Sequence, residues 1–217
     1  MPVRKKSSTA TFTDRADIIT KEARLHFPAT AQNHAAIWEV LGPLAVAAKG
    51  PVLEVASGSG EHLARFSALS PRVHWQGSDP DPGHRASILA YNPGLPEPLD
   101  LDVSADWTTS VRWSGIVAIN LLHIAPWEAT TGLLRGAAAQ LSADGWLYLY
   151  GAYFFRDRVN APSNLAFDQG LRSQNPAWGV RWLEEVVKEA ELQNLALERV
   201  VDMPANNFSL IFRRLAV

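Results

Sequence analysis

The chain has 217 residues, 47% of them hydrophobic and 19% charged, and it contains no cysteine. This composition predicts one folded domain that needs no disulfide or metal to hold it together, and it excludes thiolate chemistry. With 20 Lys and Arg against 22 Asp and Glu, the net charge of -2 provides no basic field for a nucleic-acid backbone.

No apolar run reaches the roughly 20 residues that a membrane span requires. We therefore expect a cytoplasmic protein, monomeric or homodimeric, that binds neither nucleic acid nor a membrane. Residues 1–29 are expected to form a partly flexible extension, and residues 30–217 a single domain. A polar and aromatic insertion over residues 152–179 is expected to cap that domain, because connections of this length tend to be functional.

Short β-rich apolar runs between turn signals predict strands, and apolar residues spaced three and four apart predict helices. The expected strands cover residues 52–56, 73–77, 99–103, 115–119, 146–150, 195–203 and 208–215. The expected helices cover residues 37–48, with a kink at Gly42-Pro43, then 63–69, 83–91, 126–141, closed by Asp144-Gly145, and 183–190.

This alternation of strands and helices predicts an α/β, Rossmann-like fold. Its sheet should be mainly parallel, seven-stranded and doubly wound. Only residues 204–207 separate the last two strands, so these should pair as an antiparallel hairpin.

Polar residues gather at the ends of the expected strands, where open α/β sheets bind their ligands. Such residues follow the first four strands, in the order Ser57, Gly58 and Gly60, then Asp79, then Asp102, then Asn120 and His123. A carboxylate at Asp79 is placed to accept hydrogen bonds from both hydroxyls of a ribose. The pattern predicts a nucleoside-type cofactor.

The glycine turn favours S-adenosylmethionine over a dinucleotide. A dinucleotide fingerprint requires a third small residue where this chain has Leu63. Glu54, at the end of the first strand, suits the ammonium group of S-adenosylmethionine, although Ala56 replaces the first glycine of the usual loop. A nicotinamide-dependent oxidoreductase stays open as a weaker alternative.

Several motifs resemble a methyltransferase-like family labelled domain of unknown function 938, of the methyltransferase-like protein 26 type, over about residues 32–214. These motifs are Leu53 to Gly60 with His62, Trp75-Gln76, Ser78-Asp79, Leu101-Asp102-Val103, Ile119-Asn120 with His123, Tyr150-Gly151, Ser163-Asn164, Phe167-Asp168, Leu171-Arg172, Asn175-Pro176, Trp178-Gly179 with Arg181, and Met203 to Asn207. The resemblance implies the class I methyltransferase fold and an S-adenosylmethionine site. Two departures are Gln32, where the family pattern has arginine, and Gly77, where proline is usual.

The sequence and the resemblance together give a set of candidate site residues. The cofactor-binding candidates are Asn33, Glu54, Ser57, Gly58, Gly60, His62, Asp79, Asp102, Val103 and Asn120. The catalytic candidates are His123, as a general base, and Asp168. The substrate-binding candidates are Tyr153, Asn164, Arg172, Arg181 and Asn207. No metal is expected.

Three of these candidates have simpler structural explanations. Asp168 and Arg172 stand four residues apart and can pair with each other on one helix face. His123 can shape its loop by bonding to main chain. An arginine fork over the site would instead favour an anionic substrate.

We therefore expect an enzyme, an S-adenosylmethionine-dependent methyltransferase. It would transfer a methyl group to oxygen or nitrogen of a small molecule, with an anionic acceptor weakly favoured. The alternative of another class is a non-catalytic S-adenosylmethionine-binding partner protein. The polar composition of residues 153–172 argues mildly against it, because a protein interface would be apolar.

Overall fold

A computed structural model describes residues 22–215, and the expected N-terminal extension lies outside the described residues as far as residue 21. The strands are β1 (Val52–Val55), β2 (Trp75–Gly77), β3 (Trp113–Ile119), β4 (Leu141–Phe154), β5 (Arg181–Trp182), β6 (Leu195–Met203) and β7 (Asn207–Arg214). The helices are α2 (Pro28–Val46), α3 (Glu61–Leu69), α4 (Pro82–Tyr91), α5 (Trp127–Gln140), α6 (Pro162–Gln174) and α7 (Leu183–Leu192), with short 3-10 turns η1 (Leu122–Ile124) and η2 (Pro204–Asn206).

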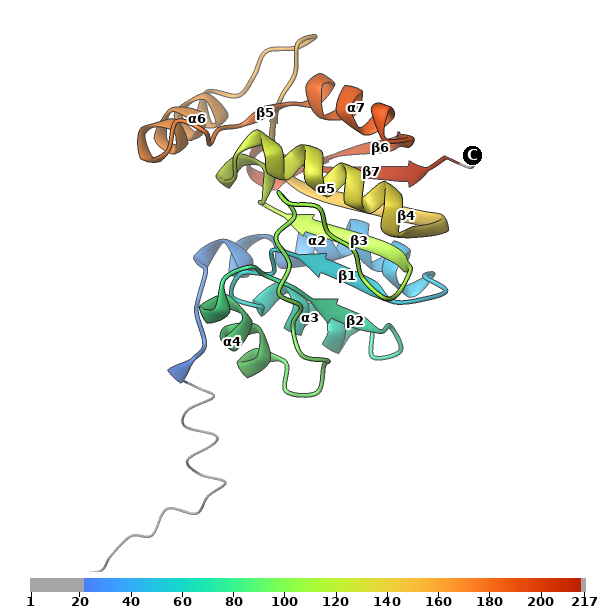
Figure 1. Ribbon diagram of the computed structural model, residues 1–217. Coiled ribbons are helices and arrows are strands. Elements are labelled where there is room, and N and C mark those ends of the chain that lie inside the picture. Colours follow the sequence, from blue (N-terminus) through green and yellow to red (C-terminus); the bar gives the residue numbers. More distant parts are fainter. Residues whose placement is uncertain (1–21, 216–217) are drawn as a thin grey trace, which may run out of the picture.

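The sheet confirms the predicted α/β class. Its strand order is β2-β1-β3-β4-β7-β6, and β5 pairs with β4 beside this path. All pairs from β2 to β4 are parallel, whereas β7 runs antiparallel to both β4 and β6. The carboxyl ends of β1, β2 and β3 therefore meet at one edge, at the left of Figure 1, where α4 and α6 also lie.

Alternate residues of the central strands enter two cores, one on each face of the sheet. Leu53 and Ile116 pack in the core that contains α5 and α7. Val52, Val117 and Tyr148 pack in the core that contains α2, α3 and α4. This double coverage explains why residues 115–119 of β3 form a continuous apolar run.

The expected strand over residues 99–103 is wrong, because only Leu99 makes a parallel bridge, to Ser78. Pro96 and Pro98 have no N–H to donate to a ladder, which limits pairing along this edge. Asp102 then accepts hydrogen bonds from the nitrogen and hydroxyl of Ser104, which turns the chain away. The short strand β5 is the seventh strand of the sheet instead.

Two other boundaries differ from the expected ones. Asp144-Gly145 does not close a helix but lies within β4, at an irregularity where the register with β3 shifts. Residues 152–179 begin as a continuation of β4 and then form α6, which projects at the upper left of Figure 1. No helix of the described residues 22–215 combines the length and apolar character needed to cross a membrane.

Candidate active site

The glycine turn between β1 and α3 forms the floor of the candidate site. Ala56, Gly58 and Gly60 all adopt positive φ, at 50°, 56° and 83°. A side chain at Gly60 would lie 2.6 Å from the main chain of Ile88, so α4 packs directly on the turn. Ala56 takes the left-handed conformation that glycine adopts more readily, at the position where the usual loop has its first glycine.

Asp79 holds the turn against the end of β2. Its Oδ2 accepts a hydrogen bond from the nitrogen of Gly58 at 3.0 Å, and its Oδ1 accepts one from the nitrogen of Asp81 at 3.0 Å. His84 Nδ1 lies 3.0 Å from the same Oδ1. The buried carboxylate is therefore fixed by two loops at the predicted place for a ribose.

Glu54 is the second buried carboxyl group of the site, with 2% of the residue exposed. Its Oε2 is buried without a hydrogen-bond partner among the described residues. Burial raises the pKa of Glu54 from 4.5 to about 8; the Ser57 hydroxyl opposes this shift and the charge of Asp79 adds to it. An orphaned carboxyl beside a cavity is suited to a cationic ligand, because a buried charge requires a partner.

A cavity of about 360 Å³ connects these groups. The cofactor-binding candidates that line it are Glu54, Ser57, Gly58, His62, Asp79 and Asn120. Gly58, the orphaned carboxyl of Glu54 and the carboxylate of Asp79 thus share one cavity, and this arrangement fits S-adenosylmethionine.

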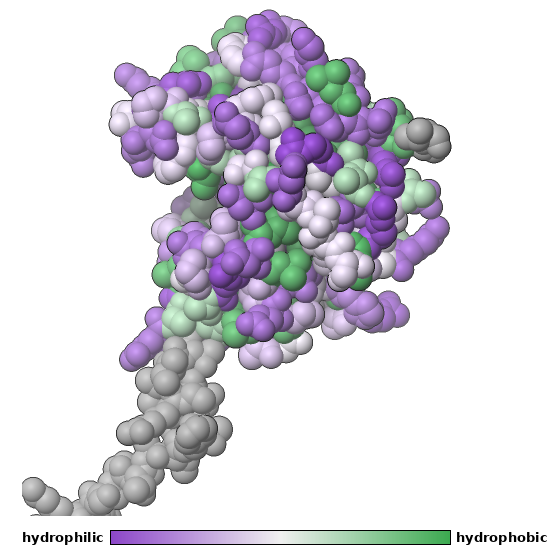
Figure 2. All heavy atoms as spheres, viewed as in Figure 1, coloured by the Kyte–Doolittle hydropathy of each residue, from purple (hydrophilic) through white to green (hydrophobic). Residues whose placement is uncertain are grey.

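A second cavity, of about 630 Å³, adjoins the first and reaches α6 and η2. The two cavities share the lining residues Phe27, Ala29, Asn120 and Ile124. The candidates Asn33, His123, Asn164 and Asn207 line the second cavity. The surface is visibly hollowed at this edge, below α6 (Figure 2). Two joined cavities provide room for a cofactor and an acceptor side by side.

The segment just before α2 lies across the glycine turn, and the sequence analysis missed it. Phe27 donates its N–H to Glu61 Oε2 at 2.9 Å, and His26 Nδ1 lies 2.8 Å from Glu61 Oε1. Burial opposes ionisation of Glu61, but the hydrogen bonds from Phe27, His26 and Ser59 outweigh it and lower its pKa. The ring of Phe27 is thereby held over Gly58, at the junction of the two cavities.

His123 lies on η1 and is buried. Burial, with a smaller effect from the charge of Arg181, lowers the pKa of His123 to about 4. The ring makes an edge contact with Phe167, their centroids 5.2 Å apart. His123 is therefore a neutral imidazole in the wall of the second cavity.

Asp168 does not face either cavity, which corrects its place among the catalytic candidates. Its Oδ2 accepts a hydrogen bond from Arg172 Nε at 2.8 Å, and its Oδ1 accepts one from the nitrogen of Val180 at 2.8 Å. Both oxygens are engaged in joining α6 to the segment before β5. A Cβ at Gly179 would lie 2.6 Å from both Asp168 and Arg172, so the pair packs closely on this segment.

Arg181 likewise makes structural hydrogen bonds and lines neither cavity. Its guanidinium donates to the carbonyls of Leu122, Ala125 and Ala177, at 2.9, 2.5 and 3.1 Å. Arg181 thus holds η1, the turn that carries His123. Neither Arg181 nor Arg172 lines the second cavity, so no arginine fork faces an acceptor there.

Arg181→Ala is expected to lower the free energy of unfolding by about 2 to 4 kcal/mol, because three carbonyls lose a charged donor. Arg181→Lys should recover only part of this loss, since a single ammonium cannot span three carbonyls. Urea denaturation measures both. Unchanged stability combined with lost acceptor binding would instead make Arg181 a substrate residue.

Three further candidates line neither of the two joined cavities. Asp102 caps its own turn and lines a separate cavity beside Trp107, while Val103 is buried against the main chain of α5. Tyr153 is buried in the core, and burial raises the pKa of its hydroxyl. Their predicted roles are not supported. Gly60 does not line the cavity, and it contributes through the positive φ that shapes the turn.

The remaining polar candidates join neighbouring elements at the second cavity. Asn33 Oδ1 lies 2.8 Å from His62 Nε2, which links α2 to α3. Asn164 Nδ2 donates to the carbonyl of Asn206 at 2.9 Å, which links α6 to η2. Asn207 Nδ2 donates to the carbonyls of η2. The cap is therefore fixed to the terminal hairpin.

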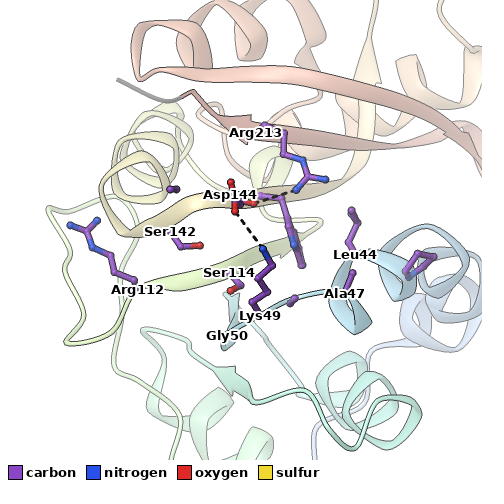
Figure 3. A pocket seen from close by; sticks show the side chains of 13 residues that line it. Leu44, Ala47, Lys49, Gly50, Arg112, Ser114, Ser142, Asp144 and Arg213 are labelled. Carbon is purple, nitrogen blue, oxygen red and sulfur yellow. Dashed lines mark hydrogen bonds and ion pairs between the residues drawn. The ribbon is translucent and has the colours of Figure 1, made fainter.

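Another cavity, of about 650 Å³, lies at the opposite edge of the sheet (Figure 3). None of the candidate site residues lines it. Its Lys49 Nζ lies 3.7 Å from Asp144, and both side chains are largely exposed. Arg213 pairs with Glu198 at 2.8 Å. Lys49 is consequently a suitable control position, remote from the glycine turn.

Among the described residues, no three His, Asp or Glu side chains are grouped to hold a metal.

The fold and its strand-end cavities define the class: this is the class I methyltransferase fold. The pyocyanin biosynthetic protein PhzM superposes with a TM-score of 0.69 at 17% identity over 82% of this chain and 54% of that protein. An O-methyltransferase family protein from Burkholderia thailandensis gives 0.68 at 18% identity over 84% and 58%.

The O-methyltransferase NcsB1 from neocarzinostatin biosynthesis, solved with S-adenosylmethionine and 2-hydroxy-5-methyl naphthoic acid, gives 0.68 at 17% identity. That likeness covers 94% of this chain and 58% of NcsB1, so the chain spans little more than half the length of these three proteins. The chain itself belongs to the DUF938 family of proteins of unknown function, which it matches over residues 24–214. The resemblance stated from the motifs is thus confirmed.

Proposed function

We propose that the protein is an S-adenosylmethionine-dependent methyltransferase that modifies an oxygen or nitrogen of a small molecule. One observation carries this proposal: the orphaned Glu54 carboxyl and the fixed Asp79 carboxylate share a cavity that opens into a second, larger one. When bound, S-adenosylmethionine supplies a methyl group on a positively charged sulfur. Glu54 would provide a carboxylate for the ammonium group at its amino-acid end, and Asp79 would accept hydrogen bonds from its ribose hydroxyls.

The residues of the second cavity orient the acceptor and exclude water. Methyl transfer depends mainly on alignment, so no catalytic triad is required. His123 takes the proton that the acceptor hydroxyl or amine loses and releases it to water. The neutral imidazole keeps the free lone pair that this role requires. Its lowered pKa makes it a weak base, so it suits an acceptor group that loses its proton readily.

Calorimetric titration with S-adenosylmethionine, S-adenosylhomocysteine and NADH tests the cofactor assignment. We expect micromolar binding of the first two and none of NADH. Binding of NADH alone would favour the oxidoreductase alternative. Cofactor binding without release of S-adenosylhomocysteine across a broad panel of phenols and amines would favour the non-catalytic alternative.

His123→Gln is expected to lower kcat by about 100-fold while leaving the Kd of S-adenosylmethionine unchanged, because a general base contributes to the rate and not to cofactor binding. With the pKa of His123 lowered to about 4, its ring is neutral above that value, so the wild-type rate should fall only as the pH drops toward 4. The measurement is the pH profile of kcat, with an acceptor found by the panel. An unchanged kcat in His123→Gln would contradict the general-base role. A histidine titration near neutral pH would contradict the lowered pKa of His123.

A further inference from the structure

The second cavity contains no charged side chain. Its 16 lining residues include no Asp, Glu, Lys or Arg. The two titratable ones are His123, which burial keeps neutral, and Tyr150, whose pKa burial raises. The volume of about 630 Å³ is typical of small-molecule sites. An occupant of this cavity therefore meets only neutral side chains along the cavity's own lining.

The two arginines that the sequence proposed as substrate contacts are already engaged. Arg172 pairs with Asp168, and Arg181 donates to three main-chain carbonyls. A carboxylate or phosphate entering the cavity would lose its hydration without gaining a protein cation. That exchange is unfavourable, because burying an unpaired charge costs far more than burying a hydrogen-bonded neutral group.

The polar groups of the cavity are suited to a neutral partner. Asn164 and Asn207 use their Nδ2 atoms on the main chain of residues 204–206. Among the described residues, neither Oδ1 atom accepts a hydrogen bond, so each is available to accept one from a ligand. Tyr150 adds a hydroxyl donor, and the rings of Phe27 and Phe167 add flat apolar surface to the wall.

We propose that the acceptor is an uncharged, ring-bearing molecule whose N–H or O–H groups are bound by the carboxamide oxygens of Asn164 and Asn207. This inference rests on the proposed methyltransferase function and replaces the anionic acceptor that the sequence favoured. The carboxamides act as specificity-determining residues. They accept hydrogen bonds from a neutral donor and offer nothing to a carboxylate.

Three matched probes test the inference: meta-hydroxybenzamide, meta-hydroxybenzoate and meta-hydroxybenzylamine. They are neutral, anionic and cationic near neutral pH and have similar shapes. Their Kd values are measured by ligand-observed NMR on the full chain, with and without S-adenosylhomocysteine. We expect the benzamide to bind at least about tenfold more tightly than the benzoate. Asn164→Ala should remove this preference, and Arg172→Ala should leave it unchanged.

Gln32 provides a charge-introducing variant, because it lines the same cavity from an exposed position on α2. Gln32→Arg is expected to tighten benzoate binding about tenfold and to change benzamide binding little, whereas the neutral Gln32→Met should do neither. Binding of S-adenosylhomocysteine in each variant shows that the variant is folded.

Two results would overturn the inference. One is benzoate binding at least as tight as benzamide binding and lost in Arg172→Ala, which would restore the anionic acceptor. The other is equal affinity for all three probes, which would mean that the cavity does not discriminate charge. Failure of the wild-type chain to bind S-adenosylhomocysteine is a separate result and would contradict the proposed function instead.

Discussion

Replacing Asp79 by alanine is expected to weaken the binding of S-adenosylmethionine by at least about 100-fold, equivalent to about 2.7 kcal/mol. The carboxylate is buried and fixed by the nitrogens of Gly58 and Asp81, so its position is set before the ligand arrives. Two ribose hydroxyls donating to a fixed carboxylate are charge-assisted hydrogen bonds, worth about 1.5 to 3 kcal/mol each. Alanine removes both, and it also releases the glycine turn.

Asp102→Ala is the matched control for this prediction. Both carboxylates were expected to contact the cofactor, but Asp102 lies at a separate cavity and binds Ser104. Its substitution should change the Kd by less than about twofold, and Lys49→Ala, at the opposite edge, should also have no effect. Calorimetry measures all three variants. Equal losses in Asp79→Ala and Asp102→Ala would show that the cofactor lies elsewhere.

Binding of S-adenosylmethionine is expected to tighten by up to about tenfold for each pH unit between about 6 and 8. In the folded chain, burial raises the pKa of Glu54 to about 8, so this carboxyl is mostly protonated at neutral pH. A cationic ligand favours the carboxylate form and therefore drives out one proton on binding. Below the pKa, that proton must be removed at a cost, and the affinity rises as the pH approaches 8.

The raised pKa of Glu54 also determines how the stability of the folded chain changes with pH. The unfolded chain has Glu54 at its ordinary value near 4.5, so folding takes up a proton between about 4.5 and 8. This contribution to stability is complete below pH 4.5 and is lost as the pH rises through 8. Without ligand, Glu54→Gln should therefore stabilise the chain at high pH, where the carboxylate of the wild type is buried and unpaired.

Glu54→Gln is also expected to remove the pH dependence of binding, because glutamine does not titrate. His62 cannot replace this effect, since burial lowers its pKa to about 4. His84→Gln, which removes the imidazole beside Asp79, serves as the control and should keep the pH dependence. The proton released on binding is counted by calorimetry in two buffers of different ionisation enthalpy. An unchanged pH slope in Glu54→Gln would assign the proton to another group.

Much of the candidate cofactor site was predictable from the sequence, because parallel strands bring their carboxyl ends to one edge. The Glu54 strand, the turn at Gly58 and the carboxylate at Asp79 were placed by strand and turn signals alone. The terminal hairpin followed from the four residues between its strands. Each of these features depends on local patterning, and neighbouring elements in the sequence are also neighbours in the sheet.

The acceptor side was less predictable, because it depends on how distant segments pack. Arg181 and Asp168 had suitable chemistry and lay near the site in sequence, yet their hydrogen bonds join main-chain segments. No periodic pattern indicated that Glu61 would hold Phe27 over the glycine turn. The strand expected near Asp102 was wrong because side-chain capping of a turn competes with sheet pairing, a choice that apolar alternation does not reveal.

A crystal structure of the chain with S-adenosylhomocysteine is the most direct test of the central claim that the strand-end cavities bind this cofactor. The account predicts the ribose on Asp79, the amino-acid end beside Glu54 and the sulfur facing the cavity lined by His123 and Asn164. Density for the ligand at the opposite edge of the sheet, near Lys49, or a ribose that does not touch Asp79, would contradict it.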